Sequence, residues 1–289
     1  MTIGTTNPDK VLWPDAGVTK GDMLDYYEAV ADAIVPHLRD RPLTVRRFPD
    51  GVGQGGWYQY ECRGAPEWLR TADIPYADGT RRTFCVVEDV RGLLWAANLA
   101  AVELHTHLHR AGALDRPTCV VFDLDPGLPA DIVDCCRVAV RLRDELAAGG
   151  LDAFPKTSGS IGVHVYVPLN LHETYSNAKA FARDLAYRLA DAFPGEVVAR
   201  NARSARRGKV LVDWLQNDPA RSMVAPYSLR AMPWPTVSTP VTWSEVHETA
   251  ASGRAELLTF RAGDATRRLA QYGDLFAPTL TLEQRLPGS

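Results

Sequence analysis

Two aspartates separated by one residue, Asp123 and Asp125, have the spacing that first suggests chemistry in this chain. They end the β-rich stretch 118–125, and the Pro-Gly pair that follows predicts that a strand stops there. Because side chains alternate along a strand, both carboxylates lie on one face and an apolar set lies on the other. Two such charges about 4 Å apart repel by roughly 4 kcal/mol at an effective dielectric near 20. A hard divalent cation is the simplest group to offset this repulsion, although such a pair on its own is more often a turn beside a solvated edge residue.

Two later β-like stretches strengthen the interpretation as a metal site. The stretch 210–215 contains a single acid, Asp213, and the stretch 163–167 presents His164 on the face opposite its valines. A loop of small residues, 157–162, precedes that strand and is suited to presenting backbone N–H groups to phosphate. Three carboxylates on a sheet are the arrangement used in two-metal phosphoryl or nucleotidyl transfer.

Length and composition are those of a globular protein. The chain has 289 residues, of which 46% are hydrophobic and 23% charged, enough for one large domain or about two ordinary ones with a real core. The formal net charge of −3 excludes a surface coated in basic charge, but nucleic-acid binding needs only a local basic patch. Most of the 32 basic residues are Arg, which suits bidentate phosphate contacts.

The N-terminus and the cysteines bear on where the protein is found. The first residues lack the pattern of a signal peptide, and the longest apolar run, 93–104, is too short and too interrupted to span a membrane. Five cysteines without a C-x-x-C pair argue against a zinc site. Their odd number and mostly apolar surroundings predict reduced, buried thiols in a cytoplasmic protein.

Capping and periodicity predict the elements that position these residues. Thr19 and Asp22 form a capping box at the start of a helix, and the stretch 43–48 is typical of a strand. An aromatic pair, Trp57 and Tyr58, follows a glycine-rich loop and is suited either to stacking on bases or to packing in the core. Further helices are predicted over residues 88–104, 132–146 and 176–193.

Two other features leave alternatives open. His105 and His109 share a face if the 88–104 helix continues, but solvated histidines at a helix end are favoured over a metal pair without a third ligand. The basic run 200–209 is typical of a solvated face, yet it leads directly into the strand of Asp213, which favours contact with phosphate.

Four segments together resemble the polymerase domain of bacterial LigD, which belongs to the archaeo-eukaryotic primase superfamily. The resemblance covers nearly the whole chain, from Asn7 to Pro240, and the combination of segments is highly specific. The segments are Asp123-Leu124-Asp125-Pro126, the loop and strand start from Thr157 to His164, Asp213-Trp214-Leu215-Gln216-Asn217, and Ala225-Pro226-Tyr227-Ser228-Leu229-Arg230.

The resemblance implies an α+β primase-polymerase fold, in which mixed and antiparallel β-sheets form a cradle flanked by helices. We expect a single LigD-like domain over residues 1–289 that acts as a stand-alone polymerase. Within it we expect an N-terminal subdomain with the 5′-phosphate and template contacts, a catalytic subdomain and a helical C-terminal tail, over residues 1–115, 116–240 and 241–289.

The resemblance also implies roles for individual residues. The catalytic, metal-binding carboxylates are Asp123, Asp125 and Asp213, which are expected to hold two Mn²⁺ or Mg²⁺ ions. The residues implied to bind the NTP or dNTP substrate are Arg46, His105, Ser158, His164, Arg206, Gln216 and Arg230. A DNA 5′-phosphate is expected at Asn7, Lys10 and Lys20, and stacking near the template is expected from Trp57 and Tyr58.

The implied function is a template-directed polymerase that adds nucleotides, often ribonucleotides, to primer 3′ ends at gaps or double-strand breaks in end-joining repair. The expected partner is DNA with a primer-template, gap or broken end, with Ku and a DNA ligase as candidate protein partners at the bacterial nucleoid. Two alternatives stay open: a primase that starts chains without a primer, and a DNA-end binding module with weak catalysis. A hydrolase is a third, although no feature favours water as the nucleophile.

Three positions depart from the family pattern. Ile161 stands where the family commonly has Lys in the small-residue loop, and Tyr60 replaces another usual Lys. Arg46 also stands in place of Lys but keeps the charge. The catalytic acids are unaffected, so we expect the chemistry to be retained and the binding of nucleotide and DNA to differ.

Overall fold

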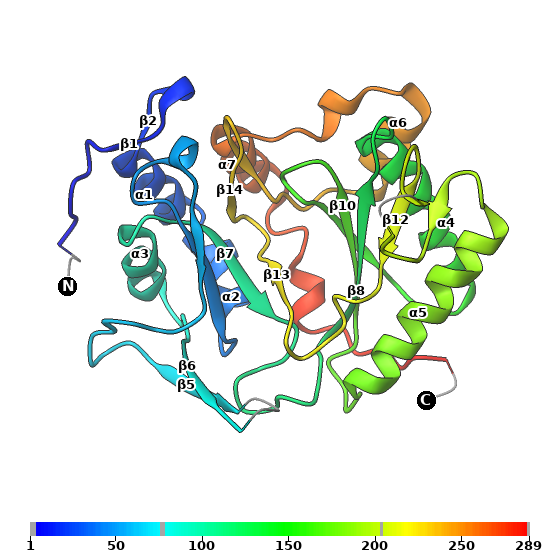
Figure 1. Ribbon diagram of the computed structural model, residues 1–289, viewed down its shortest axis with the longest axis horizontal. Helices are drawn as coiled ribbons and strands as arrows, with labels where there is room; N and C mark the ends of the chain where they lie inside the picture. Colours follow the sequence, from blue (N-terminus) through cyan, green and yellow to red (C-terminus); the bar gives the residue numbers. More distant parts are fainter. Residues whose placement is uncertain (1–3, 76–78, 203–204, 288–289) are drawn as a thin grey trace. The chain divides into compact units, whose positions relative to one another are not determined.

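The computed structural model describes residues 4–75, 79–202 and 205–287, and the chain divides into two compact units of strands and helices (Figure 1). The expected α+β fold is confirmed, because both units contain antiparallel β-pairing together with packed helices. Each unit draws on three separate pieces of chain. Unit 1 comprises Met1–Leu114, Ser222–Ser238 and Phe260–Asp274, and unit 2 comprises Asp115–Arg221, Thr239–Thr259 and Leu275–Ser289.

The first helix of unit 1 begins as the capping box predicts. The Thr19 side chain accepts a hydrogen bond from the backbone N–H of Asp22, and the Asp22 carboxylate accepts one from the Thr19 N–H at 2.8 Å. This reciprocal pair satisfies two donors at the start of α1 (Lys20–Ala29). The apolar stripe of α1 continues through Val30 into α2 (Ala31–Leu38), and its residues are buried.

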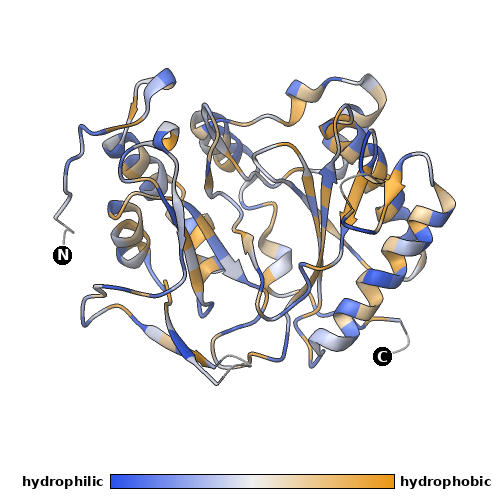
Figure 2. Ribbon diagram, viewed as in Figure 1, coloured by the Kyte–Doolittle hydropathy of each residue, from blue (hydrophilic) through white to orange (hydrophobic). Residues whose placement is uncertain are grey.

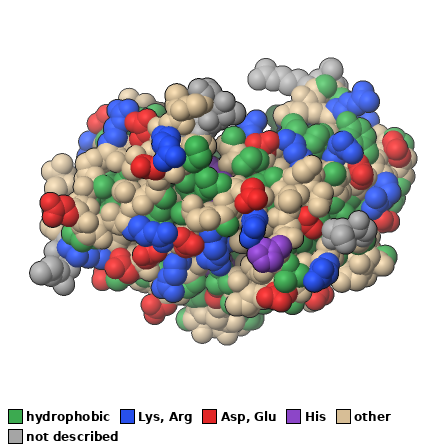
Figure 3. Space-filling model, turned by 90° about the horizontal axis from the view of Figure 1, so that it is seen from below, with side chains coloured by type: hydrophobic (Ala, Val, Ile, Leu, Met, Phe, Trp, Pro, Cys, Tyr) green, Lys and Arg blue, Asp and Glu red, His purple; other side chains and the backbone are tan. Residues whose placement is uncertain are grey.

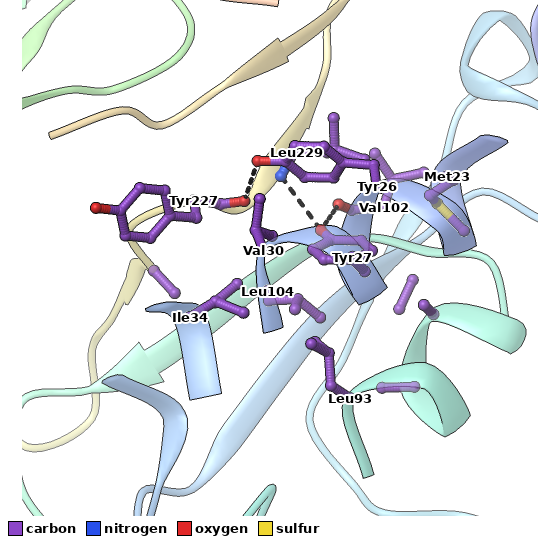
Figure 4. Close-up of a cluster of buried hydrophobic side chains, with 14 of the residues drawn as sticks. Met23, Tyr26, Tyr27, Val30, Ile34, Leu93, Val102, Leu104, Tyr227 and Leu229 are labelled. Carbon is purple, nitrogen blue, oxygen red and sulfur yellow. Dashed lines mark hydrogen bonds between the residues drawn. The ribbon is translucent and has the colours of Figure 1, made fainter. Parts of the chain in front are cut away.

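Two hydrogen-bonded tyrosines of α1 join this helix to other segments of unit 1 (Figure 4). The Tyr26 hydroxyl donates to the Tyr227 carbonyl at 2.8 Å, and the Tyr27 hydroxyl donates to the Val102 carbonyl at 2.6 Å. The Tyr27 hydroxyl also accepts a hydrogen bond from the Leu229 N–H at 3.2 Å. Because both rings are buried, each hydroxyl needs such a partner, and the pairing fixes how the helices sit on the sheet.

The central sheet of unit 1 is six-stranded and antiparallel, and it contains the predicted strand 43–48 as β3 (Leu43–Arg47). The strands follow the order β13 (Ser222–Val224), β7 (Ala101–His107), β3, β6 (Arg81–Cys85) and β5 (Thr71–Pro75), with β4 (Trp57–Gln59) paired to β3. The other elements of unit 1 are β1 (Val11–Trp13), η1 (Pro14–Ala16), β2 (Val18–Thr19), η2 (Val52–Gln54), α3 (Val90–Asn98), β14 (Leu229–Ala231), β15 (Pro235–Val237) and α7 (Ala262–Tyr272).

The helix predicted over 88–104 is too long. Helix α3 ends at Asn98, Ala100 adopts a left-handed φ of 58°, and the chain then enters the strand β7. Every residue of β7 is buried, so its apolar residues do not alternate with exposed polar ones and periodicity alone cannot separate it from a buried helix. The idea that His105 and His109 share a helical face is therefore wrong, because His105 lies on a central strand.

The prediction that all five cysteines are reduced thiols is also wrong. Cys62 and Cys85 form a disulfide with their Cα atoms 4.9 Å apart. The two residues are 23 positions apart in the sequence, and only the folding of the segment between them brings them together. Cys119, Cys135 and Cys136 are free and buried, as predicted.

Unit 2 is built on a five-stranded sheet that two long helices pack against (Figure 1). The strand order is β11 (Val197–Val198), β12 (Val210–Asp213), β8 (Cys119–Pro126), β10 (Val163–Pro168) and β9 (Phe154–Thr157). The two helices, α4 (Ile132–Ala148) and α5 (Tyr175–Ala192), confirm the predictions made for both, and polar and apolar residues alternate around α5 in Figure 2. The smaller elements are α6 (Trp243–Ser252), η4 (Ala255–Leu258) and η5 (Ala277–Leu280).

The two faces of β8 differ in polarity. Val120, Phe122 and Leu124 are fully buried, as expected for the face that supports α4 and α5. Asp123 and Asp125 alternate with them and are partly exposed. The opposite face of the sheet is therefore the one that presents carboxylates.

Surface charge in this protein is mixed in sign. Figure 3 shows Lys and Arg side chains interspersed with Asp and Glu over the face that it displays, in keeping with the formal net charge of −3. Within the described ranges, none of the helices combines the length and apolar character needed to cross a membrane.

Candidate active site

A row of four polar side chains crosses the sheet of unit 2. The strand registers pair Asp213 with Asp123 between β12 and β8, and Asp123 with His164 between β8 and β10. The next register pairs His164 with Lys156 on β9. Directly paired residues of neighbouring strands lie side by side on one face of a sheet. We call these four residues the cross-strand row; in order they are Asp213, Asp123, His164 and Lys156.

Close polar contacts join three members of the row, Asp123, His164 and Lys156. His164 Nε2 lies 3.2 Å from Asp123 Oδ1, and Lys156 Nζ lies 3.0 Å from His164 Nδ1. The Asp213 carboxylate accepts hydrogen bonds from the Leu215 N–H at 2.9 Å and from Gln216 Nε2 at 3.1 Å. These contacts fix the side chains of the row and bring the predicted residue Gln216 to the acids.

Asp125 lies two residues beyond Asp123 on the same face, and Arg206 contacts it. The Arg206 Nη2 to Asp125 Oδ2 distance is 3.4 Å. Arg206 belongs to the predicted basic run, and its backbone passes so close to Gly127 that a Cβ there would lie 1.9 Å from the Arg206 carbonyl oxygen. The glycine of the Pro-Gly break therefore lets the basic run approach the end of β8. Arg203 lies outside the described residues.

Asn217, which ends the quoted segment 213–217, ties the Asp213 strand to β8. Its side-chain carbonyl accepts a hydrogen bond from the Val121 N–H at 2.9 Å, and its amide donates to the Val121 carbonyl at 2.7 Å. Direct pairing of β12 with β8 ends at Asp213, so the amide continues the ladder with a side chain. Asn217 is fully buried and positions the Asp213 strand. This residue belongs to the motif found in the sequence, but no role was predicted for it.

The carboxylates are held where ionisation is unfavourable. Burial, with the neighbouring charge of Asp123, raises the pKa of Asp125 to about 6, although Arg206 opposes the shift. Burial also raises the pKa of Asp213. An all-oxygen set of acids that repel one another suits a hard divalent cation, so the residues fit the implied metal. Over residues 4–75, 79–202 and 205–287, no group of three or more His, Cys, Asp or Glu side chains is already arranged to hold a metal ion.

The small-residue loop is organised around Ser158. Its hydroxyl oxygen accepts hydrogen bonds from the N–H groups of Ser160 at 3.1 Å and Gly162 at 3.0 Å, and its own N–H donates to the Gly162 carbonyl. Gly159 has a left-handed φ of 72°, which the tight turn requires. The Ile161 side chain is 55% exposed, so it does not pack into a neighbouring apolar surface.

A second cluster lies in unit 1 around a buried acid, Glu103, that we did not single out from the sequence. Glu103 Oε1 lies 3.3 Å from Arg46 Nη1, and Glu103 Oε2 lies 3.0 Å from His105 Nε2 and 3.5 Å from Arg230 Nε. The same carboxylate accepts a hydrogen bond from the Ala231 N–H at 3.1 Å. We call these residues the Glu103 cluster: Glu103, Arg46, His105 and Arg230.

The charge of Glu103 is strongly favoured despite its burial. Burial alone would raise the pKa of this carboxyl, but the hydrogen bond from His105 and the charge of Arg230 outweigh it and lower the pKa to about 2. One carboxylate thus faces two guanidinium groups, and the cluster keeps net positive charge. The signal in the sequence was a single Glu two residues before His105 in a run that is otherwise apolar.

The predicted aromatic pair borders this cluster within unit 1. Trp57 and Tyr58 are 48% and 45% exposed, so they are not core aromatics. Tyr58 pairs with Arg46 across β4 and β3, and its ring meets the His105 ring edge-on with centroids 5.5 Å apart. Tyr60 stacks beside Tyr58 and is 44% exposed. Their exposure leaves these rings available to stack on bases.

The residues expected to bind a 5′-phosphate lie near the start of unit 1. The Lys20 Nζ donates to the Thr6 carbonyl at 2.5 Å and to its hydroxyl at 2.9 Å, and the residue is only 5% exposed. Lys10 is exposed and pairs with Asp50 at 3.2 Å, and Asn7 is exposed too. Lys20 is therefore not the solvated surface lysine that would be the simplest alternative to a binding role.

An α+β chain with three acids on one sheet face has the features of a primase-polymerase. The family model described as LigD, primase-polymerase domain, matches residues 19–276, and the chain belongs to this family. Membership implies polymerase activity, and a polymerase of this kind uses divalent metal and nucleotides.

Individual relatives agree with this assignment. The multifunctional non-homologous end joining protein LigD of Mycolicibacterium smegmatis is 39% identical over 279 residues, which are 96% of this chain and 36% of that protein. The bifunctional LigD of Bacillus subtilis is 30% identical over 242 residues, covering 83% of this chain and 39% of that protein. The chain thus spans little more than a third of the length of these curated relatives. The solved polymerase domain of Mycobacterium tuberculosis Ligase D in complex with DNA superimposes with a TM-score of 0.90 at 36% identity, covering 98% of this chain and 99% of that one.

Replacing Asp125 by Asn should stabilise the metal-free protein at pH 8 but not at pH 4. The folded-state pKa of about 6 exceeds the ordinary 3.8, so the ionised carboxylate penalises folding above pH 6. The penalty fades as the pH falls from 6 towards 3.8, and below 3.8 both states are mostly protonated. Each pKa unit is worth about 1.4 kcal/mol, and solvent screening of this partly exposed group reduces the gain to about 1 kcal/mol. Urea unfolding with a chelator at pH 4 and pH 8 measures the gain in the free energy of unfolding. The exposed Asp184→Asn is the control. Equal gains at both pH values would contradict the prediction.

Replacing Glu103 by Gln should destabilise the protein by about 3 kcal/mol at pH 7, because Arg46 and Arg230 would lose a buried counter-charge. The pKa of Glu103 is lowered to about 2 from an ordinary 4.5, so its stabilising effect is present above pH 4.5 and is lost as the pH falls towards 2. The gap between the two proteins should therefore narrow between pH 5 and pH 3. Urea unfolding across this range is the measurement. The control is Glu61→Gln, which removes an exposed acid and should change the free energy of unfolding little at any pH. An equally small change for Glu103→Gln would refute the stabilising role of this buried acid.

Proposed function

We propose that this chain is a template-directed nucleotidyltransferase that adds nucleotides to primer 3′ ends at gaps or breaks in DNA. The observation that carries the proposal is the convergence of Asp123, Asp125 and Asp213 on one sheet face beside His164 and Arg206. Three acids flanked by phosphate-binding side chains match the needs of nucleotidyl transfer, which needs cation sites and positioned phosphates. Family membership supports the same reaction class.

The residues of unit 2 divide into acids and phosphate-positioning groups. Asp123, Asp125 and Asp213 hold two divalent ions, Mn²⁺ or Mg²⁺. When bound, these ions supply Lewis acidity that lowers the pKa of the primer 3′-hydroxyl and neutralises the triphosphate. Arg206 offers a forked donor to phosphate, and His164 and Ser158 each add a single donor. Gln216 orients Asp213 through its 3.1 Å hydrogen bond.

The residues of unit 1 bind anionic and aromatic parts of the substrates. Arg46, His105 and Arg230 contact phosphate of the incoming nucleotide, since the Glu103 cluster keeps net positive charge. Trp57 and Tyr58 stack near the template, and a downstream 5′-phosphate binds at Asn7, Lys10 and Lys20.

The pathway that fits these substrates is end-joining repair in a bacterial cytoplasm, at the nucleoid. The matched relatives are named as non-homologous end joining proteins, and the matched solved domain is described in complex with DNA. A polymerase that fills gaps at broken ends needs a factor that holds the ends and an enzyme that seals the nick. Ku and a DNA ligase are therefore the partners that we propose.

Asp123→Asn and Asp213→Asn should each reduce nucleotide addition to background while the protein stays folded. Both changes keep the shape of the side chain but remove a charge that the cations require. The assay is primer extension on gapped DNA with Mn²⁺ and ribonucleotides, with circular dichroism as the check on folding. The control is Asp184→Asn, which removes an exposed helix acid of the same unit and should leave extension unchanged. Near-normal extension by either active-site variant at saturating metal would refute the assignment.

The DNA substrate separates the alternative functions in the same assay. Gap filling predicts extension that is stronger with a downstream 5′-phosphate than with a 5′-hydroxyl. Synthesis on bare single strands without a primer would indicate a primase. Binding of DNA ends without metal-dependent incorporation would indicate an end-binding module, and release of nucleoside products without extension would indicate a hydrolase.

Ile161→Lys should lower the KM for nucleotide roughly tenfold. The position is 55% exposed on the Ser158 loop, so a lysine has room to reach a phosphate. A charge-assisted contact is worth roughly 1.5–3 kcal/mol, and about 1.4 kcal/mol is one decade in affinity. Nucleotide titrations at fixed Mn²⁺ and DNA measure the change, and Ile161→Gln separates charge from polarity. An unchanged KM for the lysine variant, with normal thermal stability, would show that a lysine at this position does not contribute to nucleotide binding in this protein.

A further inference from the structure

Lys156 is a fully buried lysine at the end of the cross-strand row. Its Nζ lies 3.0 Å from His164 Nδ1, and the ammonium sits 5.7 Å from the centroid of the Tyr166 ring. Phe276 packs edge-on against that ring, with the ring centroids 5.0 Å apart. Burying an ammonium is costly unless its hydrogens are used, so a lysine kept here indicates a specific demand for a donor.

We infer that Lys156 is a positioning residue that fixes the ring of His164 in the tautomer that carries its proton on Nε2. An ammonium has three donors and no acceptor, so the nitrogen that faces it, Nδ1, must accept. The proton of the neutral ring then lies on Nε2, the nitrogen that faces Asp123 Oδ1 at 3.2 Å. The other tautomer would set two donors against each other at Nδ1 and a lone pair against the carboxylate at Nε2.

The strand register makes this assignment geometric. Lys156 is paired with His164 across β9 and β10, and His164 is paired with Asp123 across β10 and β8. Both ring nitrogens therefore face a partner on a neighbouring strand, and the ring is 5% exposed. A flipped ring would place the same two nitrogens in unfavourable contacts, so orientation and tautomer are set together.

The consequence rests on the proposed function. A donor at Nε2 beside the acids suits an anionic phosphate oxygen, whereas a lone pair there would repel it. Lys156 is thereby expected to act on nucleotide binding through His164, without touching the nucleotide itself. Its loss should appear in the KM and leave kcat within about threefold, since a contact made equally in ground and transition states changes only the KM.

The first experiment reads the tautomer directly in the unmodified, metal-free protein. Ring-¹⁵N histidine labelling with long-range proton–nitrogen correlation reports which nitrogen is protonated, and His164→Gln identifies the signal among the seven histidines. The expected result is a protonated Nε2 and an unprotonated Nδ1 at neutral pH. A proton on Nδ1, alone or together with one on Nε2, would overturn the inference.

The second experiment removes the donor. Lys156→Met keeps the length of the side chain without a hydrogen, and we expect the single tautomer of His164 to give way to a mixture and the KM for nucleotide to rise about tenfold. Lys179→Met is the matched control, since it removes a lysine of the same unit that pairs with Asp218 on the surface. It should change neither readout. An unaltered tautomer and KM in folded Lys156→Met would refute the positioning role.

The two experiments separate this inference from the proposed function. If Lys156→Met fails to fold, the tautomer of the unmodified protein still decides the assignment. A protonated Nε2 in a protein that adds no nucleotide would support the role of Lys156 but refute the proposed function. A protonated Nδ1 in an active polymerase would refute only the inference about Lys156 and leave the proposed function standing.

Discussion

The register between neighbouring strands of the unit 2 sheet is the constraint on which the candidate active site depends. Side chains repeat every two residues along a strand, so a slip of one residue between β12 and β8 would move Asp213 to the apolar face of the sheet, where a carboxylate is costly. Asn217 opposes such a slip by pairing with both backbone groups of Val121. On the β10 side of β8, Gly162 permits the close approach of the small-residue loop to the strand, because a Cβ there would lie 2.3 Å from the Leu124 carbonyl oxygen.

The two polar clusters carry opposite net charge. The difference comes from which charged side chains each sheet brings together. In unit 2, three carboxylates share one sheet face, and burial raises the pKa of Asp125 and of Asp213, which suits them to a cation. In unit 1, Glu103 alone faces two arginines, so its pKa is lowered and the excess charge is positive. Nucleotidyl transfer needs both kinds of site, one for metal ions and one for phosphates. Under the proposed function, the same arrangement of residues paired across adjacent strands serves both kinds of site.

The sequence predicted those features that depend on near neighbours. The capping box at Thr19, the long amphipathic helices of unit 2 and the alternation around Asp123 are all local patterns, and the structure contains each of them. Features that depend on residues distant in the sequence were not predicted. Glu103 looked like a break in an apolar run, and the β7 strand looked helical because every one of its residues is buried. The disulfide between Cys62 and Cys85 and the contact of Lys156 with His164 likewise become apparent only in the folded chain.

The exposed and buried positions of the small-residue loop explain why its departure from the family pattern is tolerated and what it costs. Ile161 is 55% exposed, so replacing a lysine there removes a charge without disturbing packing. Lys156, five residues earlier, cannot supply that charge, because it is fully buried and its ammonium is engaged with His164. Among the described residues, Arg206 contacts Asp125 with a side chain that is 24% exposed, and the charge of Arg221 acts on Asp213. Under the proposed function, contact with the triphosphate in unit 2 rests on these arginines and on neutral donors, so we expect nucleotide affinity to depend on the tautomer of His164.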